Sequence, residues 1–379
     1  VGEIHPPAAG RVALQYPPRP RSRPVPHPAM DPPLLTPDLP GCGGRIRERD
    51  DDFEVEEVPS YEPSGSGDHL YLWVEKRGMA PEYFARTVAQ RLGVRPADVG
   101  TAGLKDRHAV TRQWVSVPAA CEPRLGQLDG GGVKLLNTGR HTNKLKPGHL
   151  RGNRFRILVR GADRGAEAGV RQVLDRIRTL GLPNYYGPQR FGRGGGTVEL
   201  GWKCLAGTAP RRLRPFLYRF ALSAVQSLLF NDVLARRLVD GLYRTVLDGD
   251  VMAKWPAGGL FVAADVPAEQ ARLDAKETVP AGPMFGKKTF PAAAVAADRE
   301  AAVLRDHNLG PAAFAGFGKL LLGTRRHNLV YLDDLAAAWE ADGLRLAFTL
   351  PAGSYATVLL REVMKAHVDE ADDEPAEEE

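Results

Sequence analysis

Ala102-Gly-Leu-Lys-Asp-Arg-His-Ala-Val-Thr-Arg-Gln113 is the densest polar stretch of the chain and the motif on which the expected fold and site depend most. One carboxylate, Asp106, stands between Lys105 and Arg107, in a loop just before an expected strand. Two neighbouring cations favour the ionised form of an aspartate, the form that a nucleophile or a base requires. An aspartate between two basic residues is more often a solvent-exposed ion pair of little energy. Support must therefore come from other parts of the chain.

Segments with strand and helix periodicity surround this loop. Alternating, branched or aromatic residues predict strands within 45–58, 69–74, 113–117, 154–159 and 344–350. Apolar residues at helical spacing predict helices at 81–92, 170–180, 212–239 and 355–363. Residues 249 to about 324 are rich in Ala, Pro and Gly and predict short helical pieces. Strands and helices in this order indicate a mixed, layered structure.

A second polar stretch, from Lys134 to Arg160, carries eight Lys or Arg residues and no acidic residue. Histidine, asparagine and phenylalanine side chains are interleaved with these cations. Such a stretch suits a phosphate backbone with nearby bases. The alternative is a solvent-exposed pair of basic strands, although like charges at this density repel one another unless a polyanion screens them.

A third stretch, Leu182-Pro-Asn-Tyr-Tyr-Gly-Pro-Gln-Arg-Phe-Gly192, combines three aromatic residues with two amides and an arginine. Aromatic rings in such a loop can stack on an unpaired base, while Asn184, Gln189 and Arg190 can position a ribose or a phosphate. A turn rich in Tyr and Phe is, by itself, more often a small hydrophobic core. Both interpretations stay open at this point.

The composition indicates a folded protein with a basic body. Of the 379 residues, 43% are hydrophobic and 26% are charged, and the formal net charge is +5. Eight of the last eleven residues are acidic, so the remainder holds 51 basic and 38 acidic residues, a charge of +13. Such a body attracts polyanions, of which nucleic acid is the commonest in the cytoplasm. Without a long apolar run or a signal segment, we expect a cytoplasmic protein with no membrane contact.

Recognised cofactor and metal motifs are missing from the sequence. The glycines around Gly192 to Gly196 lack the third position of a dinucleotide fingerprint, and there is no GxxxxGK(S/T) loop. Cys42, Cys121 and Cys204 are far apart and fit neither a disulfide framework nor a zinc site. We expect no cofactor and no metal, so any chemistry must use carboxylates, basic residues and aromatic rings.

The three stretches together, in this order, resemble the tRNA pseudouridine synthase D (TruD) family. The family signature GxKDRxAVTxQ is matched from Gly103 to Gln113, and NY(F/Y)GxQRFG is matched from Asn184 to Gly192. The likeness extends from about residue 41 to 366. It implies an α+β fold with a pseudouridine synthase-type mixed, largely antiparallel sheet and flanking helices, interrupted by an α/β insertion (TRUD) domain. It also implies that uridine 13, in the D arm of certain tRNAs, is isomerised to pseudouridine.

The resemblance, the composition, the helix at 212–239 and the change of texture from residue 249 together predict the organisation of the chain. We expect a disordered, proline-rich segment at 1–40, which holds 12 of the 31 prolines, and a disordered acidic tail at 367–379. Met30 is a candidate start of the native protein. The catalytic domain is expected at 41–210 and 330–366, with the insertion domain at 211–329.

Site residues carry over from the resemblance position by position. The catalytic aspartate of the family falls on Asp106, its motif asparagine on Asn184, and its active-site aromatics on Tyr186 and Tyr355. Arg47 stands where a lysine is usual, and both tyrosines stand where phenylalanine is usual. We expect the following residues to contact the substrate or RNA: Arg47, Phe53, Glu57, Lys105, Arg107, Asn184, Tyr186, Gln189, Arg190, Phe191 and Tyr355, with Arg140, Lys144, Arg151, Arg154 and Arg156 on the basic stretch.

The hypothesis for the mechanism is that Asp106 acts on the ribose or the pyrimidine ring while Tyr186 and Tyr355 flank the base and Asn184 orients the Asp106 loop. The expected partner is tRNA, with other structured RNA left open, and no obligate protein partner is indicated. Two alternatives remain. A non-catalytic RNA-binding protein would be indifferent to Asp106, whereas a metal-dependent nuclease would need clustered carboxylates and would fail in chelator.

Overall fold

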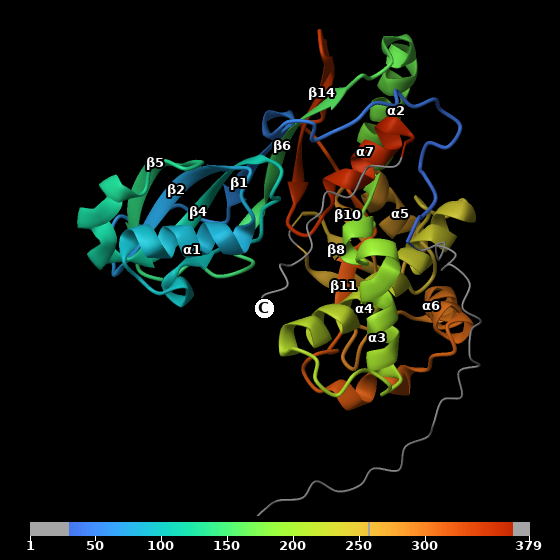
Figure 1. Ribbon diagram of the computed structural model, residues 1–379. Coiled ribbons are helices and arrows are strands. Elements are labelled where there is room, and N and C mark those ends of the chain that lie inside the picture. The colour runs from blue at the N-terminus through green and yellow to red at the C-terminus, as the bar shows by residue number, and fades with distance from the viewer. Residues whose placement is uncertain (1–29, 257, 367–379) are drawn as a thin grey trace, which may run out of the picture.

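A computed structural model describes residues 30–256 and 258–366, and its largest element is an eight-stranded sheet (Figure 1). The strands lie in the order β13-β14-β6-β1-β4-β2-β5, with β3 beside β4. Their bounds are β1 (Phe53–Pro59), β2 (His69–Arg77), β3 (Gly100–Thr101), β4 (Val110–Pro118), β5 (Val133–His141), β6 (Leu150–Arg160), β13 (Ala336–Glu340) and β14 (Gly343–Pro351). β1 and β4 are parallel, and the other pairs between these strands are antiparallel. The expected mixed, largely antiparallel sheet is confirmed.

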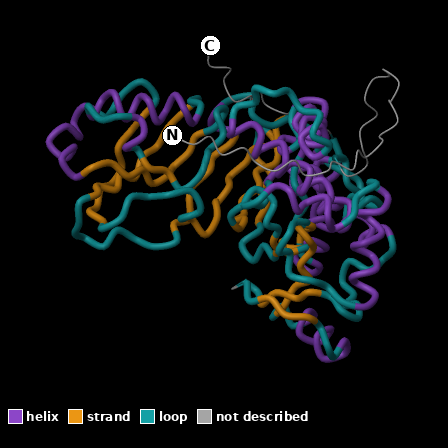
Figure 2. The backbone as a smooth tube through the Cα atoms, turned by 90° about the horizontal axis from the view of Figure 1, so that it is seen from below, coloured by secondary structure: helices purple, strands orange, loops and turns teal. Residues whose placement is uncertain are grey.

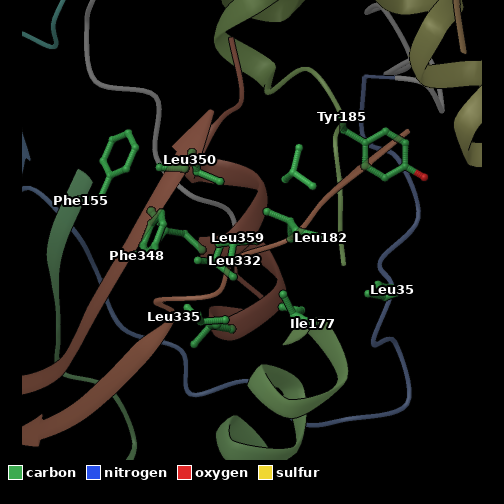
Figure 3. Close-up of a cluster of buried hydrophobic side chains, with 14 of the residues drawn as sticks. Leu35, Phe155, Ile177, Leu182, Tyr185, Leu332, Leu335, Phe348, Leu350 and Leu359 are labelled. Carbon is green, nitrogen blue, oxygen red and sulfur yellow. The ribbon is translucent and has the colours of Figure 1, made fainter. Parts of the chain in front are cut away.

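Helices cover one face of this sheet at its two ends. α1 (Pro81–Leu92) begins with a proline at its first position and ends at Gly93, whose φ of 63° suits glycine. Its apolar side packs on β2 and β4. α2 (Glu167–Leu180) and α7 (Ala356–Met364) pack on β6 and β14, where Phe155, Phe348 and Leu359 belong to one core (Figure 3).

The register places both helical layers on the same face. Leu72 pairs with Val115, and Val55 pairs with Thr111, so these four side chains point to one side of the sheet. Leu72 and Val115 contact the α1 layer, whereas Val55 belongs to the core under α2 and α7. The middle of this face lies between the two layers, beside the β3–β4 loop that carries Asp106.

A second part of the chain forms a smaller four-stranded sheet in the order β11-β10-β8-β9. Its strands are β8 (Val251–Lys254), β9 (Leu260–Val262), β10 (Thr278–Met284) and β11 (Thr324–His327), and its helices are α3 (Gly196–Leu205), α4 (Pro215–Val239), α5 (Val266–Asp274) and α6 (Ala294–Asp306). The short strands β7 (Leu182–Pro183) and β12 (Leu329–Val330) pair with each other. None of the helices that the described residues form has the length and apolarity that a membrane crossing requires.

The two parts share a hydrophobic core. Phe230 and Leu234 of α4 and Val279 of β10 belong to the cluster that also contains Phe348 of β14. Figure 2 shows the strand-rich part and the helix-rich part of the backbone in contact. The predicted boundaries of the insertion, 211–329, stay a prediction. Between residues 249 and 324 the structure has the short helices α5 and α6, as the sequence texture predicts, and also the strands β8, β9 and β10, as an α/β insertion implies. β10 includes Pro280 and Pro283, residues that argue against an inner strand.

Residues 30–40 are ordered, which corrects the expectation of a disordered segment through residue 40. Leu35 and Thr36 are buried, and the carboxylate of Glu362 on α7 accepts hydrogen bonds from both backbone N–H groups, at 2.6 and 3.1 Å. The Thr36 hydroxyl donates a third bond to the same carboxylate, at 2.6 Å. The segment has no apolar periodicity, and hydrogen bonds to a residue far away in the sequence hold it in place. The segment 1–29 and the acidic tail lie outside the described residues.

The Glu362→Ala substitution is expected to lower the free energy of unfolding by about 2–3 kcal/mol, because it leaves two buried N–H groups without an acceptor. Urea unfolding measures the effect. The exposed Glu167→Ala on α2 is the control and should change stability little. A Glu362→Ala protein as stable as the control would show that these hydrogen bonds do not stabilise the fold.

Candidate active site

Two buried lysines, Lys76 and Lys105, fix the position of the Asp106 loop. Lys76 of β2 is fully buried, and its ammonium donates to the carbonyl oxygens of Met79, at 2.6 Å, and Asp106, at 2.8 Å. Lys105 forms a buried ion pair with Glu57, in which Nζ lies 2.9 Å from Oε2. The loop is thus held at two successive residues. The Asp106 carboxylate is left 30% exposed, which keeps it accessible.

Asp106 is paired with Arg47. Nη2 of Arg47 lies 2.9 Å from Oδ1 of Asp106, and the arginine side chain is only 9% exposed. Its guanidinium also lies over the ring of Phe53, 4.2 Å from the centroid. This ion pair fixes the position of the carboxylate. The partners expected from the sequence are wrong, because Lys105 is bound to Glu57 and Arg107 is exposed to solvent.

A second cluster forms around Asn184, on the loop after β7. The Asn184 amide donates to the carbonyl of His327 at 2.9 Å, and Oδ1 accepts bonds from Ser354 and from Arg326, at 2.9 and 2.7 Å. These bonds join three distant segments, at 184, 326–327 and 353–354. They do not reach the Asp106 loop, so the structure differs from the hypothesis that Asn184 orients that loop. Lys76 and Lys105 have that role instead.

Tyr186 and Tyr355 lie together, as the resemblance implies. Their ring centroids are 5.7 Å apart with an interplanar angle of 62°. Arg326 lies over the Tyr186 ring at 4.1 Å, and Arg190 approaches the same ring at 5.6 Å. Burial raises the pKa of Tyr355, so its hydroxyl stays protonated at neutral pH. The cluster offers aromatic faces and fixed cations to a planar base.

Arg326 was not among the residues predicted from the sequence. Its guanidinium donates to the backbone oxygen of Asn184 at 2.9 Å and to Gly353 at 2.9 Å, so it links the loop before Tyr186 to the loop before Tyr355. Burial lowers its pKa. Arg325 and Arg326 are adjacent, and the sequence does not indicate which of them lies at the site. In the structure Arg325 pairs with Glu300.

The remaining residues of the third stretch divide between site and core. Gln189 is exposed and accepts a bond from the Thr357 hydroxyl at 3.2 Å. Phe191, predicted to contact RNA, is instead buried in a small core with Val198 and Leu228. The core alternative therefore applies to the Phe191 ring, and contact of this residue with RNA stays a prediction.

In the fold, some of the cations of the basic stretch are paired with carboxylates from other parts of the chain. Arg154 of β6 pairs with Glu56 of the neighbouring β1 at 2.9 Å, and Arg140 pairs with Glu122. Lys144 donates to the carbonyl of Ala97, and Arg151 donates to that of Ser60 at 3.4 Å.

Strand geometry also places part of this stretch away from the Asp106 loop. Asn153 is opposite Glu57, the residue that anchors this loop, whereas Arg154 is opposite Glu56. Successive side chains of a strand point to opposite faces, so Arg154 and Arg156 project from the other face of the sheet. RNA contact by the basic stretch stays a prediction.

A row of buried and half-buried polar side chains lies across the sheet face next to this loop. Gln113, Glu57 and Asn153 occupy adjacent strands, and each has a buried oxygen without a hydrogen-bond partner among the described residues. An inner sheet face is normally apolar, and buried polar atoms are normally paired. These oxygens mark the floor of the site as a polar surface, which the sequence did not indicate.

An α+β sheet with a fixed, accessible carboxylate in the loop before β4 is the arrangement expected of the pseudouridine synthase class. Comparisons with known proteins agree. The model of the family "tRNA pseudouridine synthase D (TruD)" matches residues 30–208 and 203–363. A tRNA pseudouridine synthase D from Anaeromyxobacter sp. (strain Fw109-5) is 46% identical over 352 residues, which cover 91% of this chain and 99% of the relative.

Two further matches have the same description. A tRNA pseudouridine synthase D from Thermus thermophilus is 45% identical over 91% of this chain and 96% of its own length. The crystal structure of a putative tRNA pseudouridine synthase D from Methanosarcina mazei has the same fold, with a TM-score of 0.72 and 24% identity, over 88% of this chain and 96% of that one. The chain belongs to the tRNA pseudouridine synthase D family, and so to the enzymes that isomerise uridine in tRNA.

Proposed function

We propose that this protein isomerises the uridine at position 13, in the D arm of tRNA, and that Asp106 is the catalytic carboxylate. The observation that carries the proposal is the geometry of Asp106. Its backbone oxygen is held by the buried Lys76 and its neighbour Lys105 is held by the buried Glu57, while its carboxylate is accessible and paired with Arg47. A preorganised carboxylate of this kind suits nucleophilic or proton-transfer chemistry.

Isomerisation of uridine requires one bond to break, one bond to form and one proton to move. The bond from C1′ to N1 breaks, a bond from C1′ to C5 forms, C5 loses its proton and N1 gains one, so the atoms balance without a redox partner. In one route the ionised Asp106 attacks C1′ and leaves again; in the other it removes a proton and the sugar undergoes elimination. Tyr186 and Tyr355 then hold the freed base by stacking while it turns. Arg47 holds the Asp106 carboxylate in position.

Access to the site requires that the uridine leave the stacked RNA. Extruding a nucleotide costs a few kcal/mol, which contacts to phosphates elsewhere on the RNA offset. The basic body of the protein favours such contacts. The cytoplasm, where tRNA is found, is the compartment in which we expect this protein to act, with tRNA as its partner.

Mapping of pseudouridine in bulk tRNA tests the proposal. Purified protein is incubated with tRNA that lacks the modification, and pseudouridine is located by carbodiimide-dependent primer extension or mass spectrometry. We expect a new pseudouridine at position 13 of a subset of tRNAs. Pseudouridine at another position of the tRNA would overturn the assignment of uridine 13 as the target. RNA that is bound but unmodified would favour a non-catalytic binding protein. Chelator should not reduce the rate, whereas a metal-dependent nuclease would cleave the RNA and fail in chelator.

A further inference from the structure

The first turns of α4 carry two aromatic rings that do not belong to the hydrophobic core. Phe216 is 58% exposed, although it continues the apolar stripe formed by Ala224, Leu228 and Val233. The stripe reaches the core only from residue 221 onward. Phe216 stacks on Phe220, with centroids 5.9 Å apart and an interplanar angle of 8°. The exposed ring of Phe216 and the half-buried ring of Phe220 are parallel and form a flat apolar surface rather than part of a core.

This ring pair is connected to the candidate active site. Arg190 lies 4.9 Å from the Phe220 centroid and 5.6 Å from that of Tyr186. Its guanidinium is fixed on α4 by bonds to the hydroxyls of Ser223 and Ser227. A continuous series of planar groups therefore runs from Tyr355 through Tyr186, Arg190 and Phe220 to Phe216.

The charge around Phe216 is positive. Arg211, Arg212 and Arg219 are exposed, and none of them forms an ion pair with a carboxylate of residues 30–256 or 258–366. The first turn of α4 contains no acidic residue. In contrast, Arg154 on the basic stretch is paired with Glu56. Exposed rings beside unpaired arginines are the combination that binds single-stranded nucleic acid, in which bases stack and phosphates meet cations.

We propose that the face formed by Phe216, Phe220 and the arginines at 211, 212 and 219, called here the α4 platform, binds the RNA substrate at a second nucleotide. An unpaired base stacks on Phe216, and the arginines contact the phosphates beside it. This base lies some nucleotides away from the target uridine, because Arg190 and Phe220 separate the platform from Tyr186. The inference rests on the proposed function and adds to it a contact that holds the RNA while the target is extruded.

Equilibrium binding of unmodified tRNA tests the α4 platform, with all variants in an Asp106→Asn background so that no product forms. Phe216→Ala should weaken binding roughly 10-fold or more, as expected for the loss of one stacked base. Phe216→Tyr keeps a stacking face and should bind normally. Replacing Arg211 and Arg212 by Gln should reduce the slope of log Kd against log salt by about 2. Controls are Tyr83→Ala on α1, whose side chain is 57% exposed, and the exposed Arg305→Gln.

The outcomes separate this inference from the proposed function. Wild-type protein that makes no pseudouridine would overturn the proposed function. In an active protein, Phe216→Ala that binds tRNA as tightly as Tyr83→Ala overturns the α4 platform alone. The same holds if Phe216→Ala changes only the sedimentation of the free protein, since the rings would then join two copies of the chain.

Discussion

The Asp106→Asn protein is expected to lose about three orders of magnitude or more in the rate of pseudouridine formation, while its affinity for tRNA changes little. Asparagine has the shape of aspartate but can neither attack C1′ nor accept a proton with comparable strength. Removal of a nucleophile or base from a working site typically costs effects of this size. Arg47 retains its contact with Phe53, so the surroundings of the loop should persist. Single-turnover kinetics with saturating protein measures the chemical step.

Asp98 provides a matched control for this experiment. It is an aspartate paired with an arginine, Arg95, and its side chain is 29% exposed, against 30% for Asp106. Asp98→Asn should therefore keep the wild-type rate. If Asp106→Asn forms pseudouridine as fast as Asp98→Asn does, the carboxylate of Asp106 takes no part in the reaction, and another group must be sought on the polar floor of the site.

Most of the fold was predictable because its signals are local. α1 was predicted at its observed bounds, since its first-turn proline, its apolar spacing and Gly93 all agree. The strand β10 was not predicted, because Pro280 and Pro283 remove donors and break the alternation by which strands are recognised. Only its neighbours β8 and β11, each far away in sequence, make it a strand.

The ion pairs of the site could not be predicted from the sequence either. The sequence motif identifies Asp106, but its nearest cations in the chain are not its partners. The ion pair with Arg47 spans 59 positions, and that of Lys105 with Glu57 spans 48. Arg154 likewise meets an acidic neighbour, Glu56, 98 positions away, so a basic run in the sequence is partly neutral in the fold. Spacing along a chain does not determine such long-range pairs.

The buried pair of Lys105 and Glu57 should dominate the stability of the site. Lys105→Met is expected to lower the free energy of unfolding by about 3–5 kcal/mol, because it leaves the Glu57 carboxylate buried without a counter-charge. Oε1 of Glu57 already lacks a partner among the described residues, so little else is present to compensate. Urea unfolding measures the loss. The double variant with Glu57→Gln removes the uncompensated charge and should recover part of the stability, in the manner of a double-mutant cycle.

The ion pair of the neighbouring glutamate on β1 provides the comparison. Arg154 and Glu56 are also 2.9 Å apart, but their side chains are 55% and 37% exposed, so Arg154→Met should cost under about 1 kcal/mol. The two pairs share the N···O distance and have adjacent glutamates on β1, and they differ in burial. Equal losses for Lys105→Met and Arg154→Met would mean that Lys105 is hydrated in solution. The Asp106 loop would then not be fixed as its contacts indicate, and the preorganisation on which the proposed catalysis depends would be missing.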